Sequence, residues 1–168
     1  ERAVDDGVQA VAQAVKDVNK HGAARLCYGG GCSEMALSVK LQDAATKVPG
    51  LQQYAMHAFS QALLVVPRTL AENAGHNASK TLAHLKAAHH HHHESAAAGD
   101  VCDIGIDIED EDTNNSVDGG DGICGMKEGG IVDMLATKQS ALRLAVDTVT
   151  TILKIDQIIM SKQAGGPK

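Results

Sequence analysis

The chain has 168 residues, enough for one domain with a hydrophobic core of its own. It contains no Trp, one Phe and two Tyr, so Ala, Val, Leu, Ile and Met must build the core, which favours closely packed helices over a β-sandwich. A net charge of −6 argues against nucleic acid as a partner, and no apolar run is long enough to cross a membrane.

The sequence opens at Glu1 within a helical pattern and without an initiator Met, so we expect a piece of a longer protein. Residues 2–20 predict the first helix, because apolar residues recur four and three positions apart along one stripe: Val4, Val8, Val11, Val15 and Val18. Glycines 29–31 cannot continue a helix cheaply and predict a loop. A second helix is expected from about Ser33 to Thr46.

Residues 51–63 carry the clearest amphipathic pattern of the chain and predict a third helix. Pro67 suits the first turn of a short fourth helix, and Gly75 is placed to end it. Asn77 or Ser79 is expected to cap a fifth helix that runs to about residue 88.

The regular pattern stops after residue 88. Residues 89–93 are five consecutive His, which we interpret as a low-complexity expansion in a surface loop. Residues 100–121 hold nine Asp or Glu and no Lys or Arg, and most of this stretch should be a solvated loop. Alternating Ile residues within Cys102–Ile108 predict one short strand.

A last helix is expected over about Lys138–Leu153, followed by a β-prone tail over residues 154–160. We expect the tail and Cys102–Ile108 to be the only strands. The four cysteines are irregularly spaced and are typical of free cytosolic thiols rather than of a disulfide framework or a zinc site.

Four short segments, in order along the chain, resemble motifs of the group II chaperonins. Residues 66–75 read V-P-R-T-L-A-E-N-A-G and closely match the signature (I/V)-P-R-x-L-A-E-N-x-G. The other three segments are Glu1–Asp6, Gly29–Glu34 and Gly130–Asp133. The closing residues 155–168 are similar to those of one subunit type of the eukaryotic cytosolic members. The resemblance covers nearly the whole chain except residues 90–100 and 110–122.

The resemblance implies a mainly α fold in two parts. Residues 1–26 would be one helix of the intermediate domain. Residues 27–168 would be the C-terminal half of the equatorial ATPase domain, a helical bundle with a short β-strand or hairpin and a C-terminal edge strand. Residues 90–122 would form a His-rich and acidic surface insertion.

The motif residues have plain structural explanations when taken alone: Asp5 and Asp6 as acids that suit a helix start, the glycines as a tight turn, and Asp133 as an acidic cap. The resemblance implies more for some of them. It gives Asp6 the catalytic role of orienting the water that attacks the γ-phosphate, and it gives nucleotide contacts to Gly29, Gly30, Gly31 and Asp133. Glu72 and Asn73 are instead expected to make buried hydrogen bonds that fix the short fourth helix.

The resemblance also implies ATP and Mg²⁺ as cofactors of an intact, cytoplasmic subunit. Such a subunit would work in a double ring with other chaperonin subunits, on unfolded client proteins. The G-D-G-T-T phosphate loop and the Mg²⁺-binding Asp belong to the half of the family's sequence that is not in this chain. We therefore predict that the chain alone neither hydrolyses ATP nor binds it tightly.

Two alternatives remain open. Residues 110–121 place oxygen ligands at positions 1, 3, 5, 9 and 12 of an EF-hand-like loop, which would suit a Ca²⁺-responsive binding module. Asn115 stands where that loop needs Gly, and Asp121 stands where it needs Glu, so an acidic insertion is favoured. The other alternative is a helical scaffold that lost the ATPase. A metal site at the His run is not predicted.

Overall fold

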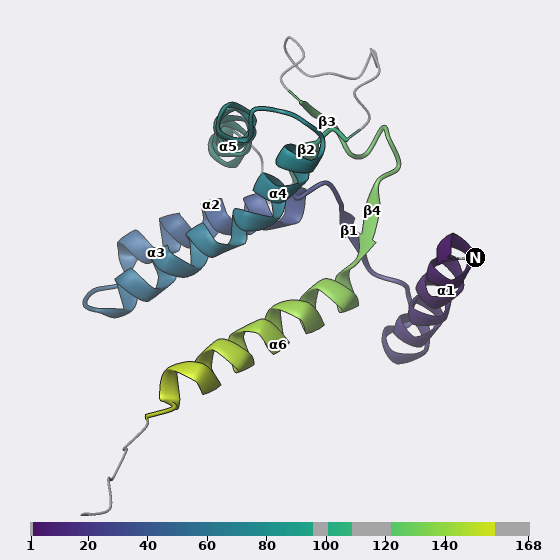
Figure 1. The fold of residues 1–168 in the computed structure, drawn as a ribbon, viewed down its shortest axis with the longest axis horizontal. Helices are drawn as coiled ribbons and strands as arrows, with labels where there is room; N and C mark the ends of the chain where they lie inside the picture. Colours follow the sequence, from purple (N-terminus) through teal and green to yellow (C-terminus); the bar gives the residue numbers. More distant parts are fainter. Residues whose placement is uncertain (1, 96–100, 109–121, 157–168) are drawn as a thin grey trace, which may run out of the picture. The chain divides into compact units, whose positions relative to one another are not determined.

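The computed structural model describes residues 2–95, 101–108 and 122–156. These residues belong to two compact units, Glu1–Met134 and Leu135–Lys168. In chain order the described elements are α1 (Arg2–His21), β1 (Leu26–Tyr28), α2 (Cys32–Lys47), α3 (Gln52–Leu63), α4 (Val65–Asn73), α5 (Ala78–Ser95), β2 (Ile104–Ile106), β3 (Ile123–Gly125), β4 (Val132–Met134) and α6 (Leu135–Lys154) (Figure 1). The prediction of a mainly helical chain is confirmed.

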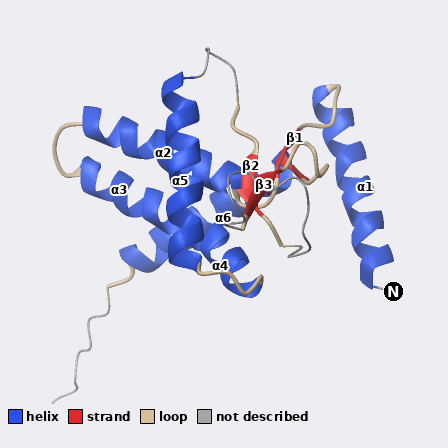
Figure 2. Cartoon of the chain, turned by 90° about the horizontal axis from the view of Figure 1, so that it is seen from above, coloured by secondary structure: helices blue, strands red, loops and turns tan. Residues whose placement is uncertain are grey.

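Helices α2 and α3 form a hairpin in which they pack against each other (Figures 1 and 2). Gly50, with a φ of +86°, makes the turn between them. The buried Ser38 hydroxyl donates a 2.8 Å hydrogen bond to the carbonyl oxygen of Ser60, so a polar pair is satisfied between the two helices. Both helices match their predicted bounds to within one residue.

Helix α4 ends as its sequence predicts. Gly75 adopts a φ of +82°, and its N–H donates to the carbonyl oxygen of Glu72 over 3.1 Å. The N–H of His76 donates to the carbonyl oxygen of Ala71 over 3.0 Å, which completes a Schellman motif. Asn77 then caps α5, since its Oδ1 accepts the Lys80 N–H over 3.2 Å.

The described strands form two antiparallel pairs, β1 with β4 and β2 with β3. The prediction that Cys102–Ile108 and the tail would be the only strands is therefore wrong. β1, β3 and β4 have three residues each, too few to show an alternating pattern, and β1 pairs with a strand about a hundred residues away. Residues 155 and 156 are irregular, and the remainder of the predicted tail strand lies outside the described residues.

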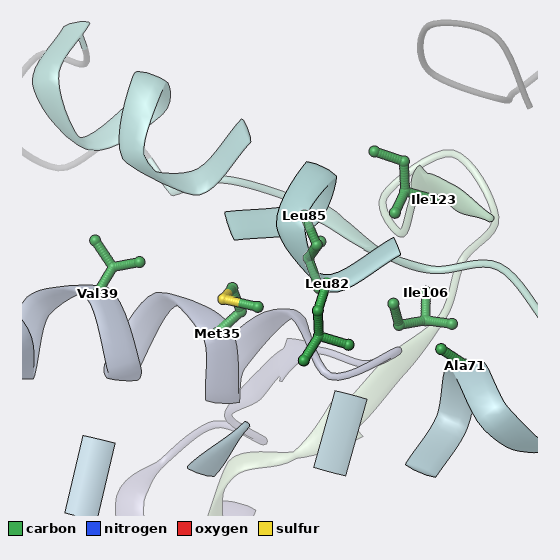
Figure 3. Packing of buried hydrophobic residues seen from close by; sticks show 7 residues of the cluster. All are labelled: Met35, Val39, Ala71, Leu82, Leu85, Ile106 and Ile123. Carbon is green, nitrogen blue, oxygen red and sulfur yellow. The ribbon is translucent and has the colours of Figure 1, made fainter. Parts of the chain in front are cut away.

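The main core lies where α2, α4 and α5 meet the β2–β3 pair. Seven buried side chains from these elements pack together (Figure 3): Met35, Val39, Ala71, Leu82, Leu85, Ile106 and Ile123. All are aliphatic or thioether side chains, as the shortage of aromatic residues requires. Two of the positions come from α5, which places this helix over the small sheet.

The His run is part of helix α5, and its interpretation as a surface loop is wrong. The helix continues through all five histidines to Ser95. His89 is 3% exposed, and its Nε2 lies 2.9 Å from the carbonyl oxygen of Ile104, so it belongs to the contact between α5 and β2. His93 approaches Asp43 of α2 with an Nδ1–Oδ2 distance of 3.4 Å. Helix packing thus overrides the low complexity of the sequence.

The β2–β3 pair is closed at the ends that border the acidic stretch. The Asp107 N–H donates to the Gly122 carbonyl oxygen over 3.0 Å, one residue beyond the pairing of Ile106 with Ile123. The Nε2 atom of His76 lies 3.0 Å from the Asp107 carbonyl oxygen. These contacts fix both ends of the segment between residues 108 and 121, and the acidic loop predicted there lies outside the described residues.

Helices α1 and α6 each expose an apolar face. The five stripe valines of α1 are between 41% and 69% exposed. In α6, considered by itself, the residues Leu144, Val149 and Ile152 are more than half exposed. None of the described helices combines the length and apolar character needed to span a bilayer. All four cysteines lie in the described ranges, and none of them is joined in a disulfide there.

Candidate functional site

The pairing of β1 with β4 brings Asp133 to the glycine triplet. Asp133 stands opposite Cys27 in the strand register, and the Gly29 N–H donates to the Ile131 carbonyl oxygen over 3.0 Å. The Asp133 Oδ2 atom lies 3.5 Å from the position that a Cβ on Gly29 would take. Two candidate segments that are 102 residues apart in sequence thus meet at one end of the β1–β4 pair.

Each glycine of the triplet faces a different close neighbour. A Cβ on Gly29 would lie 2.8 Å from the Ile131 Cγ2, and a Cβ on Gly31 would lie 2.8 Å from the Pro67 Cβ. A Cβ on Gly30 would overlap the Sδ of Met126. Gly30 and Gly31 also have φ values of +59° and +74°, which disfavour any L side chain. Packing and backbone conformation together require glycine at these positions.

The backbone of the triplet is anchored through its carbonyl groups. Ile106 donates its N–H to Gly30 over 2.8 Å, Cys32 to Gly29 over 3.0 Å, and Met35 to Gly31 over 3.0 Å. Gly31 is also the N-cap residue of α2, which starts at Cys32 without a side-chain cap. The positive end of the α2 dipole therefore lies beside the triplet and favours an electron-rich ligand.

Pro67 connects the signature segment to this loop. It is buried in the first turn of α4 and contacts Gly31 as described above. Glu72 and Asn73 of the same segment are exposed, so the expectation that they make buried hydrogen bonds is wrong for this chain. The buried contribution of the signature comes from Pro67 and from Ala71 in the core.

Asp6 lies on the exposed first half of α1, and the contacts that build the Asp133–glycine site do not include it. The C-terminal part of α1 is connected to the residue before β1 by hydrogen bonds between Asp17 and Arg25. Asp17 is 4% exposed and accepts hydrogen bonds from the Arg25 N–H, over 2.9 Å, and from the Arg25 Nη2, over 3.0 Å. These hydrogen bonds lower the pKa of Asp17 below its usual value.

Within the described ranges, no cluster of three or more His, Cys, Asp or Glu side chains is arranged to hold a metal. The site instead offers one carboxylate beside a closely packed backbone loop and a helix N-terminus. The structure brings together Asp133 and the glycines, which the sequence proposed as site residues, whereas the sequence did not predict the contacts of Met126 and Asp17.

Comparison with known proteins agrees with the motif resemblance. A model of the TCP-1/cpn60 chaperonin family matches residues 1–163. The chain is 43% identical over its whole length to the probable T-complex protein 1 subunit theta of Schizosaccharomyces pombe and covers 27% of that protein. The subunit theta of Saccharomyces cerevisiae is 41% identical, again over the whole chain and 28% of that protein. The human subunit theta is 37% identical, over the whole chain and 27% of that protein.

A solved structure gives the same result at the level of the fold. The open-state monomer of a group II chaperonin from Methanococcoides burtonii matches with a TM-score of 0.63 and 27% identity. The match covers 77% of this chain and 28% of that one. The chain thus spans little more than a quarter of the length of these relatives. From its sequence and its fold, the chain belongs to the TCP-1/cpn60 chaperonin family.

Proposed function

We propose that this chain is part of an ATP-dependent cytoplasmic chaperonin subunit that assists the folding of client proteins. The observation that carries the proposal is the Asp133 carboxylate beside the glycine triplet at the start of α2. The relatives named as subunits of T-complex protein 1 support the assignment to such a subunit.

In this proposal the chain supplies the nucleoside side of an ATP pocket. Asp133 accepts hydrogen bonds from the ribose hydroxyls, since an ionised carboxylate is an acceptor only. Gly29, Gly30 and Gly31 bring backbone close to the flat part of the nucleotide, which side chains would prevent. The phosphate loop and the Mg²⁺ ligand come from another part of the subunit, so the chain alone neither binds ATP tightly nor hydrolyses it.

Asp6 is assigned the catalytic role in hydrolysis. Phosphoryl transfer to water requires a group that orients the attacking water, and a carboxylate can accept one of its protons. Asp6 is carried on α1, whose attachment through Asp17 and Arg25 leads directly into β1 and the glycine triplet. Hydrolysis then biases a two-state closure of the double ring, formed with other chaperonin subunits, around an unfolded client.

The test compares Asp133→Ala, Asp6→Ala and Asp5→Ala in the full-length subunit within its assembled ring. Occupancy is measured by photolabelling of this subunit with an azido-ATP analogue, and hydrolysis by single-turnover kinetics. Asp133→Ala should weaken occupancy about ten- to a hundredfold, because it removes hydrogen bonds to a charged acceptor. Asp6→Ala should keep occupancy and abolish the hydrolysis of this subunit. Asp5→Ala is the matched control and should change neither.

Each role has its own contrary result. Single-turnover hydrolysis that persists in Asp6→Ala would remove the water-orienting role. Unchanged occupancy in Asp133→Ala would remove the ribose contact. A wild-type subunit that takes no label would support the scaffold alternative instead. The calcium alternative depends on residues 110–121, which lie outside the described residues, and it stays a prediction from the sequence.

A further inference from the structure

Met126 is buried at the junction of the two segments that form the candidate site. Its side chain is 0% exposed and packs in a small cluster with Cys32, Cys124 and Tyr28. The Sδ atom occupies the space that a Cβ on Gly30 would need, and Cγ lies 2.8 Å from the corresponding position on Gly105. The thioether therefore fills the gap between the glycine triplet and the β2 strand.

The backbone of Met126 is tied to the other half of the site. Its N–H donates to the Asp103 carbonyl oxygen over 2.8 Å, which fixes it to the segment before β2. Its carbonyl oxygen accepts the Ile131 N–H over 3.0 Å. Ile131 in turn lies two residues before Asp133 and accepts the Gly29 N–H. One residue thus supports the triplet with its side chain and the approach to Asp133 with its backbone.

We infer that Met126 is a positioning residue that sets the separation between the glycine triplet and the Asp133 carboxylate, and so sets nucleotide affinity. The inference rests on the proposed function. Gly30 has no side chain that could fill the space left by the Met126 thioether. Removal of the thioether would therefore leave a cavity next to Gly30, into which the triplet could shift. A small displacement is enough to weaken binding, because the groups of a binding site must stay close to their productive geometry.

Pro67 and Ile131 also pack against one glycine each, Gly31 and Gly29 respectively. The side chain of each contacts the triplet at that single glycine. Met126 joins the triplet, β2 and the segment before β4 through separate contacts. A core residue without this connection is Leu85, which is 0% exposed and belongs to the other hydrophobic cluster. Leu85 therefore serves as the control for a purely structural effect.

The experiment places Met126→Ala, Met126→Leu and Leu85→Ala in the full-length subunit within its ring. Occupancy of this subunit by azido-ATP is titrated, and the fold is checked by thermal unfolding. Met126→Ala should raise the half-saturating concentration at least about tenfold, with a smaller change in the single-turnover rate at saturation. Met126→Leu, which restores the bulk, should recover most of the affinity. Leu85→Ala should lower the unfolding temperature and leave the affinity near wild type.

The outcomes separate the inference from the proposed function. If wild-type subunit is labelled and competed by ATP, but Met126→Ala binds as well as wild type, the positioning role is wrong and the pocket stands. If Met126→Ala and Leu85→Ala weaken binding equally, Met126 acts only through stability and the inference is again wrong. If the wild-type subunit itself takes no label, both the pocket and the inference fail.

Discussion

At the scale of single residues, His89 shows what burial does to an ionisable group in this fold. Its Nε2 lies 2.9 Å from the Ile104 carbonyl oxygen, so the neutral ring donates a hydrogen bond there. Burial lowers the pKa of His89, and the nearby His92 and His90 lower it further, while the Ile104 hydrogen bond and Asp103 oppose the shift. The folded chain therefore prefers the uncharged imidazole.

This preference predicts that acid destabilises the chain through His89. Below the unfolded-state pKa of about 6.5, His89 is protonated in the unfolded chain but stays neutral in the folded chain until the pH reaches its lowered pKa. The contribution of His89 to stability is present above that pH and is lost as pH falls toward the lowered folded-state pKa. Urea unfolding between about pH 7.5 and about pH 5.5 should show a shallower loss of stability for His89→Gln, which keeps a donor but does not titrate. The control is His84→Gln, at an exposed position of the same helix; equal pH slopes for wild type and His89→Gln would contradict the prediction.

The residues of the candidate site divide by whether a local motif marks them. Asp133 and the glycines could be predicted, because each lies in a short segment that resembles a known motif. Met126 and Asp17 could not, since their importance depends on contacts with residues that the sequence does not place beside them, such as Gly30 and Arg25. The sequence also did not show why each position of the triplet must be glycine, because a different neighbouring side chain leaves no room for a Cβ at each of them.

At the scale of elements, the helices could be predicted and the strands could not. Helix ends are set by local chemistry, as the Asn77 cap and the Gly75 termination illustrate. Strands of three residues depend on partners far along the chain and leave no periodic pattern. Helix α5 extended beyond its prediction, because the contact of His89 with β2 continues the buried face past residue 88.

Gly75 offers a test of one helix end that involves backbone strain alone. It has a φ of +82°, and, apart from Gly75 itself and its two chain neighbours, no atom of the described residues lies within 4 Å of the position that its Cβ would take. Gly75→Ala should therefore lower the free energy of unfolding by about 1 kcal/mol without any clash. Gly7→Ala, inside α1 and equally free of neighbours, should not destabilise, because alanine favours a helix interior. Chemical unfolding of both variants checks the contrast, and a neutral Gly75→Ala would mean that the motif does not hold α4.

At the scale of the whole molecule, each of the two described units exposes a large amount of apolar surface to solvent. The valine stripe of α1 and the apolar residues of α6 are exposed on helices whose patterns suit burial. Both lie in a chain that spans little more than a quarter of its relatives. The main hydrophobic cluster, in contrast, is formed by seven side chains of α2, α4, α5 and the β2–β3 pair.

We predict that the isolated chain self-associates through the α1 stripe. Val11 and Val15 are each more than half exposed, so burying them between molecules is favourable. A double change to Lys at these two positions should weaken association at least about tenfold in sedimentation equilibrium. Lys at the exposed polar positions Gln9 and Asn19 adds the same charge to the same helix and should have little effect. A monomeric wild-type chain, or equal effects of the two pairs, would contradict the prediction.

The hydrogen bond between the Asp107 N–H and the Gly122 carbonyl oxygen, at one end of the β2–β3 pair, has a practical consequence. Because a hydrogen bond joins Asp107 to Gly122, we expect the β2–β3 pair to tolerate a change in the number of residues between its two strands. Extending a connection whose ends are already held together adds only slowly to its entropic cost. This position therefore suits the insertion of an affinity peptide or a fluorescent reporter, through which the protein could be purified or followed in cells without altering either terminus.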